Sequence, residues 1–220
     1  MNEYKNLLQL YKHPFTLIRL GCNRDGGYVI PKELINSNLL SCGISNEISF
    51  EEDYIKHLKI CNVHCFDGTI NNFPSKNITF NWHKINIGST DSDFEVSLNT
   101  IFEKCFNNNE IFMKMDIEGS EYPAFDTIFN DNLKKINCLV IEVHWIDRDY
   151  EKFKKLMNKI KTEMVLIHKH DNNNGNYFQT LDSSRLCNVY ELTFVNKKYI
   201  EQMIPNDIQL PIIGLDFNNR

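Results

Sequence analysis

Residues 111–122 read IFMKMDIEGSEY, and this stretch decides the fold. The apolar run Ile111–Met113 leads to the acids Asp116 and Glu118 and then to a Gly-Ser pair, which is typical of a buried parallel strand that opens into a helix. One acid or serine suffices to cap such a helix, and a third acid, Glu121, exceeds this need. Ligands of open α/β sheets bind beyond the carboxyl ends of the strands. We therefore expect Asp116 to lie at a ligand site.

Six other stretches have strand character, and helical spacing separates most of them. They are residues 39–43, 63–67, 80–87, 138–144, 164–170 and 189–195. Helices are expected over residues 48–58, 92–106 (starting with a capping box), 120–130 and 149–161. No helical pattern separates the last two strands, so they should pair antiparallel. The order predicts an α/β fold with a doubly wound, mostly parallel seven-stranded sheet and a terminal antiparallel pair.

The chain length fits a single domain with decorations at both ends. One domain over residues 1–220 would carry an N-terminal helix and hairpin in residues 1–36 and a tail in residues 200–220. The helix is expected over residues 2–12, and an Asp-Gly pair marks the hairpin turn. The tail contains proline and is expected to lie over the surface.

Charge and composition exclude several classes of protein. The net charge of −5 provides no basic footprint for nucleic acid. The sequence has neither an apolar run of membrane-spanning length nor a signal-peptide core, so we expect a cytoplasmic protein without a membrane span. The seven cysteines include no C-x-x-C pair, which favours free thiols in a reducing compartment.

Two strand ends indicate a nucleoside-binding edge. Gly43 follows the first predicted strand, and Ser45 stands before a helix, as in the turn of a βα unit that binds a nucleotide. Asp67 ends the next strand, where a carboxylate accepts hydrogen bonds from both ribose hydroxyls. Farther along the chain, Glu142 and His144 are two residues apart and point to one side of their strand.

Several longer motifs resemble those of a known family. They are RDGGY (24–28), CGISNEISFEED (42–53), Phe66-Asp67, KMDIEGSEY (114–122), Glu142–His144 and the strand with His168 and His170. Together they resemble the FkbM family of S-adenosylmethionine-dependent methyltransferases over residues 17–195. The resemblance implies a Rossmann-like class I fold and transfer of a methyl group to a hydroxyl of a sugar or another scaffold.

The resemblance also implies roles for individual residues. The cofactor would be held by Gly43, Ser45, Glu47, Ser49, Asp67, Gly68, Ile87, Gly88 and Asp116. Among these, Asp67 would bind the ribose, and Ile87 and Gly88 would border the adenine. The acceptor would be bound by Asp25, Gly26, Gly27, Tyr28 and His170. We expect a small sugar or sugar-nucleotide acceptor, such as a nucleotide-activated sugar for a capsule or another surface glycan, and a homo-oligomer is compatible with this activity.

Methylation of a hydroxyl requires more than alignment of donor and acceptor, because the hydroxyl must lose its proton. His144 is the preferred general base, because histidine ordinarily titrates near neutral pH, and Asp116 and Glu118 would assist it. The alternative is a divalent cation, Mg²⁺ or Mn²⁺, that polarises the hydroxyl. Its ligands would be Asp116, Glu142, His144 and His170, which offer oxygen and imidazole donors.

Three other classes compete with this interpretation. An NAD-dependent oxidoreductase would also use a strand-end glycine and an acid, but the G-x-G-x-x-G fingerprint is absent. A non-catalytic relative that binds a nucleoside would leave the dense acids and histidines unexplained. A metal-dependent hydrolase lacks support, because no H-E-x-x-H motif occurs.

Overall fold

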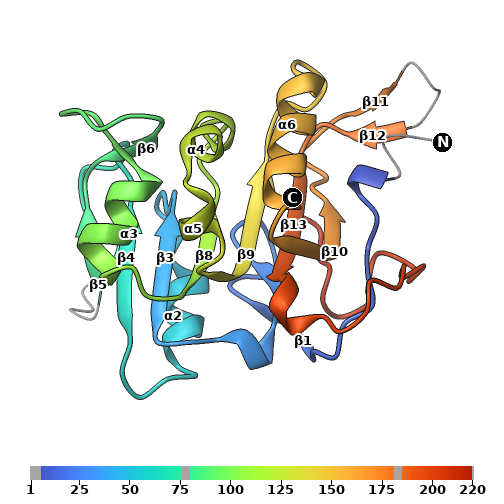
Figure 1. The fold of residues 1–220 in the computed structure, drawn as a ribbon, viewed down its shortest axis with the longest axis horizontal. Coiled ribbons are helices and arrows are strands. Elements are labelled where there is room, and N and C mark those ends of the chain that lie inside the picture. The colour runs from blue at the N-terminus through green and yellow to red at the C-terminus, as the bar shows by residue number, and fades with distance from the viewer. Residues whose placement is uncertain (1–5, 76–79, 181–184, 220) are drawn as a thin grey trace.

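A seven-stranded sheet forms the centre of the protein, as a computed structural model shows (Figure 1). The structure describes residues 6–75, 80–180 and 185–219. Across the sheet, the strands are β10 (Met164–Asp171), β13 (Tyr190–Asn196), β9 (Ile136–Val143), β8 (Ile111–Met115), β3 (Asn38–Cys42), β4 (Asn62–Phe66) and β5 (Phe80–His83). Strand β13 runs antiparallel to both of its neighbours, β10 and β9, and the other neighbouring strands of this sheet pair in parallel. The predicted sheet and its terminal antiparallel pair are confirmed.

Helices and a hairpin cover the two faces of the sheet. One face carries α3 (Leu98–Phe106), α4 (Glu121–Thr127), α5 (Asn130–Leu133) and α6 (Tyr150–Ile160), which lie in front of the sheet in Figure 1. The other face carries α2 (Ser49–Ile55) and the antiparallel hairpin of β1 (Leu17–Leu20) and β2 (Tyr28–Pro31). Two separate apolar clusters result, one on each face, as a doubly wound sheet requires.

Strand β8 divides its side chains between the two faces. All five residues are buried. Met113 and Met115 pack in the cluster under α3, α4 and α6, and Phe112 packs in the cluster under α2. Strand β8 lies beside β3, the first strand of the sheet, and the chain winds outward from this pair in both directions. In doubly wound folds, ligands bind at such a switch point.

The predicted third strand, residues 80–87, is wrong in one respect. It divides into β5 in the main sheet and β6 (Asn86–Gly88), which pairs in parallel with β7 (Glu95–Ser97). The amide of Ile85 donates to the carbonyl of His83 at 2.9 Å, and this tight turn takes the chain out of the sheet. The alternating pattern fits both pieces, so the sequence does not mark the break.

The predicted capping box at residues 92–95 is also wrong. Ser92 accepts hydrogen bonds from the amides of Phe94 and Glu95, but within a turn that precedes β7. Helix α3 starts later, and its N-cap is Ser97, which accepts from the amide of Thr100. The predicted helix over residues 120–130 is likewise shorter, since Ile128 has extended backbone angles that separate α4 from α5.

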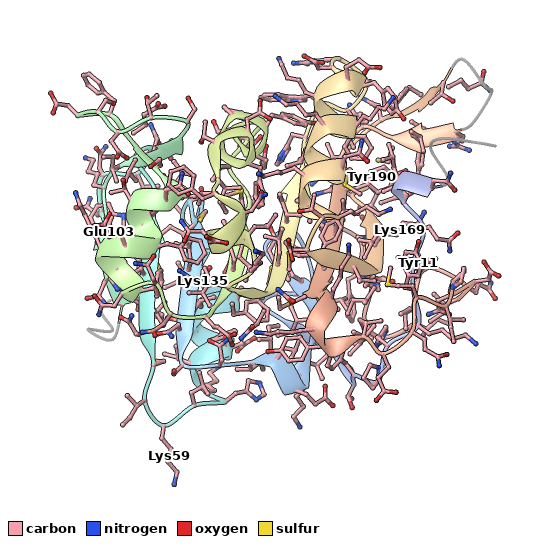
Figure 2. All side chains as sticks on the ribbon, in the orientation of Figure 1. Tyr11, Lys59, Glu103, Lys135, Lys169 and Tyr190 are labelled. Atoms are coloured by element: carbon pink, nitrogen blue, oxygen red, sulfur yellow. The ribbon has the colours of Figure 1, made fainter. Side chains whose placement is uncertain are left out.

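Both ends of the chain agree with expectation only in part. Residues 2–5 of the predicted helix over residues 2–12 lie outside the described residues. Residues 6 and 7 are helical, but the helix ends there, and Tyr11 forms a bridge with Pro205. Tyr11 lies beside β10, because its amide donates to the carbonyl of Leu166 in that strand at 3.0 Å; Figure 2 labels Tyr11 and Lys169 of β10. Most described residues of the tail are exposed, as expected for a segment on the surface, but Asn219 near its end is only 5% exposed.

Two further features complete the fold. A small antiparallel hairpin, β11 (Tyr177–Gln179) with β12 (Arg185–Cys187), occupies a region in which we expected no strand. Both strands are short, with three residues each, and leave little periodicity to detect. Among the described residues, no helix is long and apolar enough to cross a membrane.

Candidate active site

A cavity of about 610 Å³ opens where the carboxyl ends of β3, β4 and β8 meet. Its volume lies in the range that is ordinary for small-molecule sites. The residues that we expected at a site and that line this cavity are Asp25, Gly26, Gly43, Ser45, Glu47, Asp67, Ile87, Asp116 and Glu118. Seven lining residues were not predicted: Ile44, Phe66, Thr69, Asn86, Lys114, Ile117 and Ser120. The two predicted strand-end acids, Asp67 and Asp116, thus border one cavity.

Gly43 is required by the backbone at the base of this cavity. Its φ angle is +74°, which side-chain-bearing residues rarely adopt. A Cβ atom there would lie 1.6 Å from the carbonyl oxygen of Asp116. The turn is also tied to the neighbouring strands, because the amide of Gly43 donates to Phe66 and the amide of Asp116 donates to Cys42, each at 2.9 Å. The ends of β3 and β8 therefore approach more closely than a residue with a side chain at position 43 would allow.

The carboxylate of Asp67 is held by donors from two directions. Oδ2 accepts from the amides of Ile44 at 3.1 Å and Ser45 at 2.8 Å. Oδ1 accepts from the amide of Thr69 at 2.8 Å and its hydroxyl at 2.6 Å. Burial alone would raise the pKa of Asp67, but the hydrogen bonds from Thr69, Ser45 and Ile44 outweigh burial and lower it. Asp67 is therefore ionised at neutral pH and fixed against the β3 turn.

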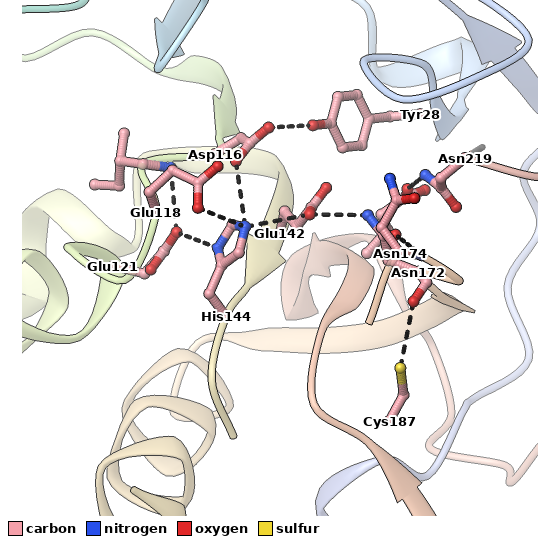
Figure 3. Close-up of polar contacts among 12 residues, drawn as sticks. Tyr28, Asp116, Glu118, Glu121, Glu142, His144, Asn172, Asn174, Cys187 and Asn219 are labelled. Carbon is pink, nitrogen blue, oxygen red and sulfur yellow. Dashed lines mark hydrogen bonds and ion pairs between the residues drawn. The ribbon is translucent and has the colours of Figure 1, made fainter. Parts of the chain in front are cut away.

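His144, just beyond β9, lies among four carboxylates (Figure 3). Its Nδ1 is 3.1 Å from Oε1 of Glu121, which is fully buried and also accepts from the amide of Ile117. Its Nε2 faces the other three acids: Oε1 of Glu142 at 3.2 Å, Oε2 of Glu118 at 3.6 Å and Oδ1 of Asp116 at 3.8 Å.

The neighbouring carboxylates determine the protonation state of His144. Burial lowers the pKa of His144, but the hydrogen bonds with Glu121 and Glu142 outweigh it and raise the pKa to about 11. The imidazole is thus protonated at neutral pH and acts as a donor, in place of the near-neutral titration that we expected. Burial, opposed only in part by the hydrogen bond from His144, raises the pKa of Glu142.

Two more residues fix the carboxylate of Asp116 and the floor of the cavity. The hydroxyl of Tyr28, on β2, donates to Oδ2 of Asp116 at 2.9 Å. The ammonium of Lys114, in β8, donates to the carbonyl of Gly43 and lies 5.5 Å from the centre of the Tyr28 ring. Lys114 is buried within an otherwise apolar strand. A lysine in such a strand is unusual, and this pattern in the sequence could have identified Lys114 as a site residue.

Several expected site residues do not line the cavity. Ser49 accepts from the amide of Cys22, and Gly68 donates to Asn86. Gly88 packs against the side chain of Glu95, and Gly27 packs against the Cys22 carbonyl and the Arg19 side chain. Each of these four residues therefore supports a neighbouring loop in the structure. Tyr28 does not line the cavity and contacts it through Asp116 and Lys114.

The predicted metal set of Asp116, Glu142, His144 and His170 is not brought together as a group. His170 lies against the C-terminal tail, with Nε2 3.2 Å from Oδ1 of Asn219 and Nδ1 3.6 Å from Asp216. Two other combinations converge, with ligand atoms within 4.8 Å of one another: Asp116, Glu118 and His144, and next to them Asp25, Glu142 and Glu191. Burial and Glu142 raise the pKa of Glu191 well above its usual range.

Comparison with known proteins agrees with this geometry. A family described as the methyltransferase FkbM domain matches residues 13–184, which is most of the chain. No curated protein matches the chain closely enough to add to this finding.

Proposed function

Because the chain belongs to the methyltransferase FkbM family, we propose that it transfers a methyl group from S-adenosylmethionine to a hydroxyl of a sugar. The observation that carries this proposal is that Asp67 and Asp116 border the same cavity, and that the His144 cluster lies next to Asp116. We further propose a nucleotide-activated sugar as the acceptor. The support is the resemblance to the family and the many polar groups beside the cavity, which suit a hydroxyl-rich molecule.

The residues present fit the cofactor. When bound, S-adenosylmethionine supplies an electrophilic methyl group on a positively charged sulfonium. The carboxylates of Glu47 and Asp116 line the cavity and favour a cation there. Gly43 keeps its turn free of side-chain atoms at the same place. Asp67 would bind the ribose hydroxyls.

Asp67 can bind a ribose hydroxyl only if one of its present hydrogen bonds is broken. A carboxylate offers about four acceptor positions. In the structure four donors already occupy Asp67: the amides of Ile44 and Ser45, and the amide and hydroxyl of Thr69. The three amides belong to fixed backbone, whereas a hydroxyl rotates. We therefore infer that the Thr69 hydroxyl yields its place to a ribose hydroxyl.

A carboxylate is the group that would remove the proton from the acceptor hydroxyl. His144, with its raised pKa, already carries a proton at neutral pH and cannot take another. Glu118 lines the cavity, is 76% exposed in its side chain, and lies 3.6 Å from Nε2 of His144. Its φ angle of +52° is a strained conformation of the kind found at functional sites. We propose that Glu118 accepts the proton, that His144 positions Glu118 and Asp116, and that Glu121 holds His144.

A divalent cation at Asp116, Glu118 and His144 is the second candidate for lowering the pKa of the acceptor hydroxyl. The observation in its favour is the convergence of these three ligand atoms beside the cavity. Mg²⁺ and Mn²⁺ prefer oxygen ligands, which two of the three residues supply. Asp116, Glu118 and His144 would hold the cation, which would take the place of the proton on His144 and would polarise the acceptor hydroxyl.

Transfer of a labelled methyl group tests the proposal. The purified protein is incubated with methyl-labelled S-adenosylmethionine and a panel of nucleotide-activated sugars, free sugars and amino sugars, and products are identified by mass spectrometry. We expect label on a hydroxyl oxygen, and we expect Glu118→Gln to lose most turnover. The matched control is Glu103→Gln, an exposed glutamate of α3 on the left of Figure 2.

Two outcomes would contradict the proposal. Label on nitrogen would refute the hydroxyl as acceptor. A protein that binds the cofactor yet labels no member of the panel, with or without added Mg²⁺ or Mn²⁺, would favour the non-catalytic relative.

A further inference from the structure

A second cluster of metal-binding side chains lies outside the active-site cavity. His64 is in β4, His83 ends β5, and Cys105 is in α3, which packs over these strands. One ligand atom from each of the three lies within 4.8 Å of the others. All three residues are partly buried, so an ion can reach them from solvent. Because Cys105 is far from both histidines in the chain, only the fold assembles this set.

Hydrogen bonds define which atoms His64 offers. Its Nε2 is 3.0 Å from Oδ1 of Asn62, while Nδ2 of the same amide donates to the carbonyl of Cys105 at 3.2 Å. The second contact fixes the orientation of the amide, so Oδ1 faces His64 and Nε2 must carry the hydrogen. Nδ1 of His64 therefore presents a lone pair, toward Nε2 of His83 at 2.8 Å. Histidines that bind metals almost always donate their other N–H to an oxygen in this way.

The rings are also held in place by packing. The planes of His64 and His83 differ by only 18°. Phe106 packs edge-on against His64, with 5.0 Å between the ring centroids, and Phe66 stacks on His83, with 4.3 Å between the ring centroids. Asn62 connects two of the three ligand residues through one side chain. Such support from neighbouring residues is what distinguishes a prepared metal site from a chance approach of side chains.

We propose that His64, His83 and Cys105 bind a transition-metal ion of the zinc class, with a fourth position open to water. Two imidazoles and one thiolate are donors that zinc prefers over Mg²⁺ or Ca²⁺. Zinc–nitrogen bonds of about 2.0–2.1 Å in tetrahedral geometry separate the two nitrogens by about 3.3 Å. The nitrogens are now 2.8 Å apart, so they must separate by about 0.5 Å as the ion replaces the hydrogen between them. His83 would then carry its hydrogen on Nδ1, and the thiol of Cys105 would release its proton to solvent.

The site does not depend on the proposed methyl transfer, yet it adjoins the cavity. Phe66, which stacks on His83, is also a wall of the cavity. A bound ion would fix His83 and would thereby hold Phe66 in position.

Titration of the reduced, metal-free protein with Co²⁺ tests this assignment. A thiolate bound to Co²⁺ gives an absorption band that oxygen and imidazole ligands do not give, so the active-site clusters, which contain no cysteine, do not contribute to it. We expect the band to saturate at one equivalent and to disappear when Zn²⁺ is added. Asn62→Ala should weaken Co²⁺ binding by about 10–100-fold, because it removes the partner that orients His64.

Cysteine variants identify the ligand. Cys105→Ser should abolish the thiolate band, whereas Cys61→Ser, a partly buried cysteine outside the cluster, should keep it. Thermal melting without metal shows whether each variant folds, and Cys105→Ala serves in place of Cys105→Ser if the serine variant does not. The assignment is overturned if the wild-type protein gives no thiolate band, or if the band survives in a folded Cys105 variant.

Discussion

Substitution of Asp67 by asparagine perturbs both the fold and the proposed cofactor site, and the two effects can be separated. Asn has one acceptor oxygen, so it can satisfy either the amides of Ile44 and Ser45 or the two donors of Thr69, but not both pairs. Hydrogen bonds to charged groups contribute about 1.5–3 kcal/mol each. Because two of the four bonds are lost, we expect the free energy of unfolding to fall by about 3–6 kcal/mol.

The effect on binding follows from the same side chain. The ribose would lose its charged acceptor, which should raise the Kd for S-adenosylhomocysteine by about 10–100-fold, because each 1.4 kcal/mol corresponds to tenfold. Urea unfolding measures the first effect, and isothermal titration calorimetry measures the second. The matched control is Asp126→Asn, which removes an exposed carboxylate 2.8 Å from Lys155 and should change stability by less than about 1 kcal/mol. A folded Asp67→Asn protein with wild-type affinity would refute the reasoning.

Three further predictions concern other parts of the molecule. His144→Gln should lose most turnover but keep its affinity for S-adenosylhomocysteine, because His144 contacts the acids and does not line the cavity; measurement of kcat and of Kd separates the two. Gly43→Ala should destabilise the protein severely in urea unfolding, since the added methyl would meet the backbone oxygen of Asp116. Asp216→Asn should lower stability at neutral pH, because burial alone would raise the pKa of Asp216 but its hydrogen bond with His168 outweighs burial and lowers it. A lowered folded-state pKa adds stability above the ordinary Asp pKa and loses it as pH falls further, so the difference from wild type should vanish only in strong acid.

Each of these predictions has an outcome that would contradict it. Full turnover of His144→Gln would remove this residue from catalysis. Wild-type stability of Gly43→Ala would mean that the β3 turn is looser than its φ angle indicates. A constant difference between Asp216→Asn and wild type down to strong acid would mean that the carboxylate charge does not stabilise the tail.

The sequence predicted the parts of the fold that depend on continuous apolar runs. Strand β8 is buried on both faces, and its apolar residues and strand-end acids identify it without knowledge of its neighbours. The break between β5 and β6 was not predictable in the same way, because alternation continues through it and only the hydrogen bond of Ile85 reveals it. The capping box failed because Ser92 has the same hydrogen-bonding capacity in a turn as at a helix start.

In the candidate site, too, features that depend on the local sequence were predictable, and features that depend on contacts between distant residues were not. Asp67 and Asp116 were predictable because each ends a strand, and parallel strands bring their carboxyl ends to one edge. The raised pKa of His144 was not predictable from the sequence, because it depends on a contact with Glu121, a fully buried residue of another element. His170 has the same sequence signal as His144, but the C-terminal tail occupies its surroundings.

Calorimetric titration of the wild-type protein with S-adenosylhomocysteine, and separately with NAD, tests the central claim most directly. The cavity between the two strand-end acids should bind S-adenosylhomocysteine at one site per chain and should show no binding of NAD. Binding of NAD without binding of S-adenosylhomocysteine would contradict the account.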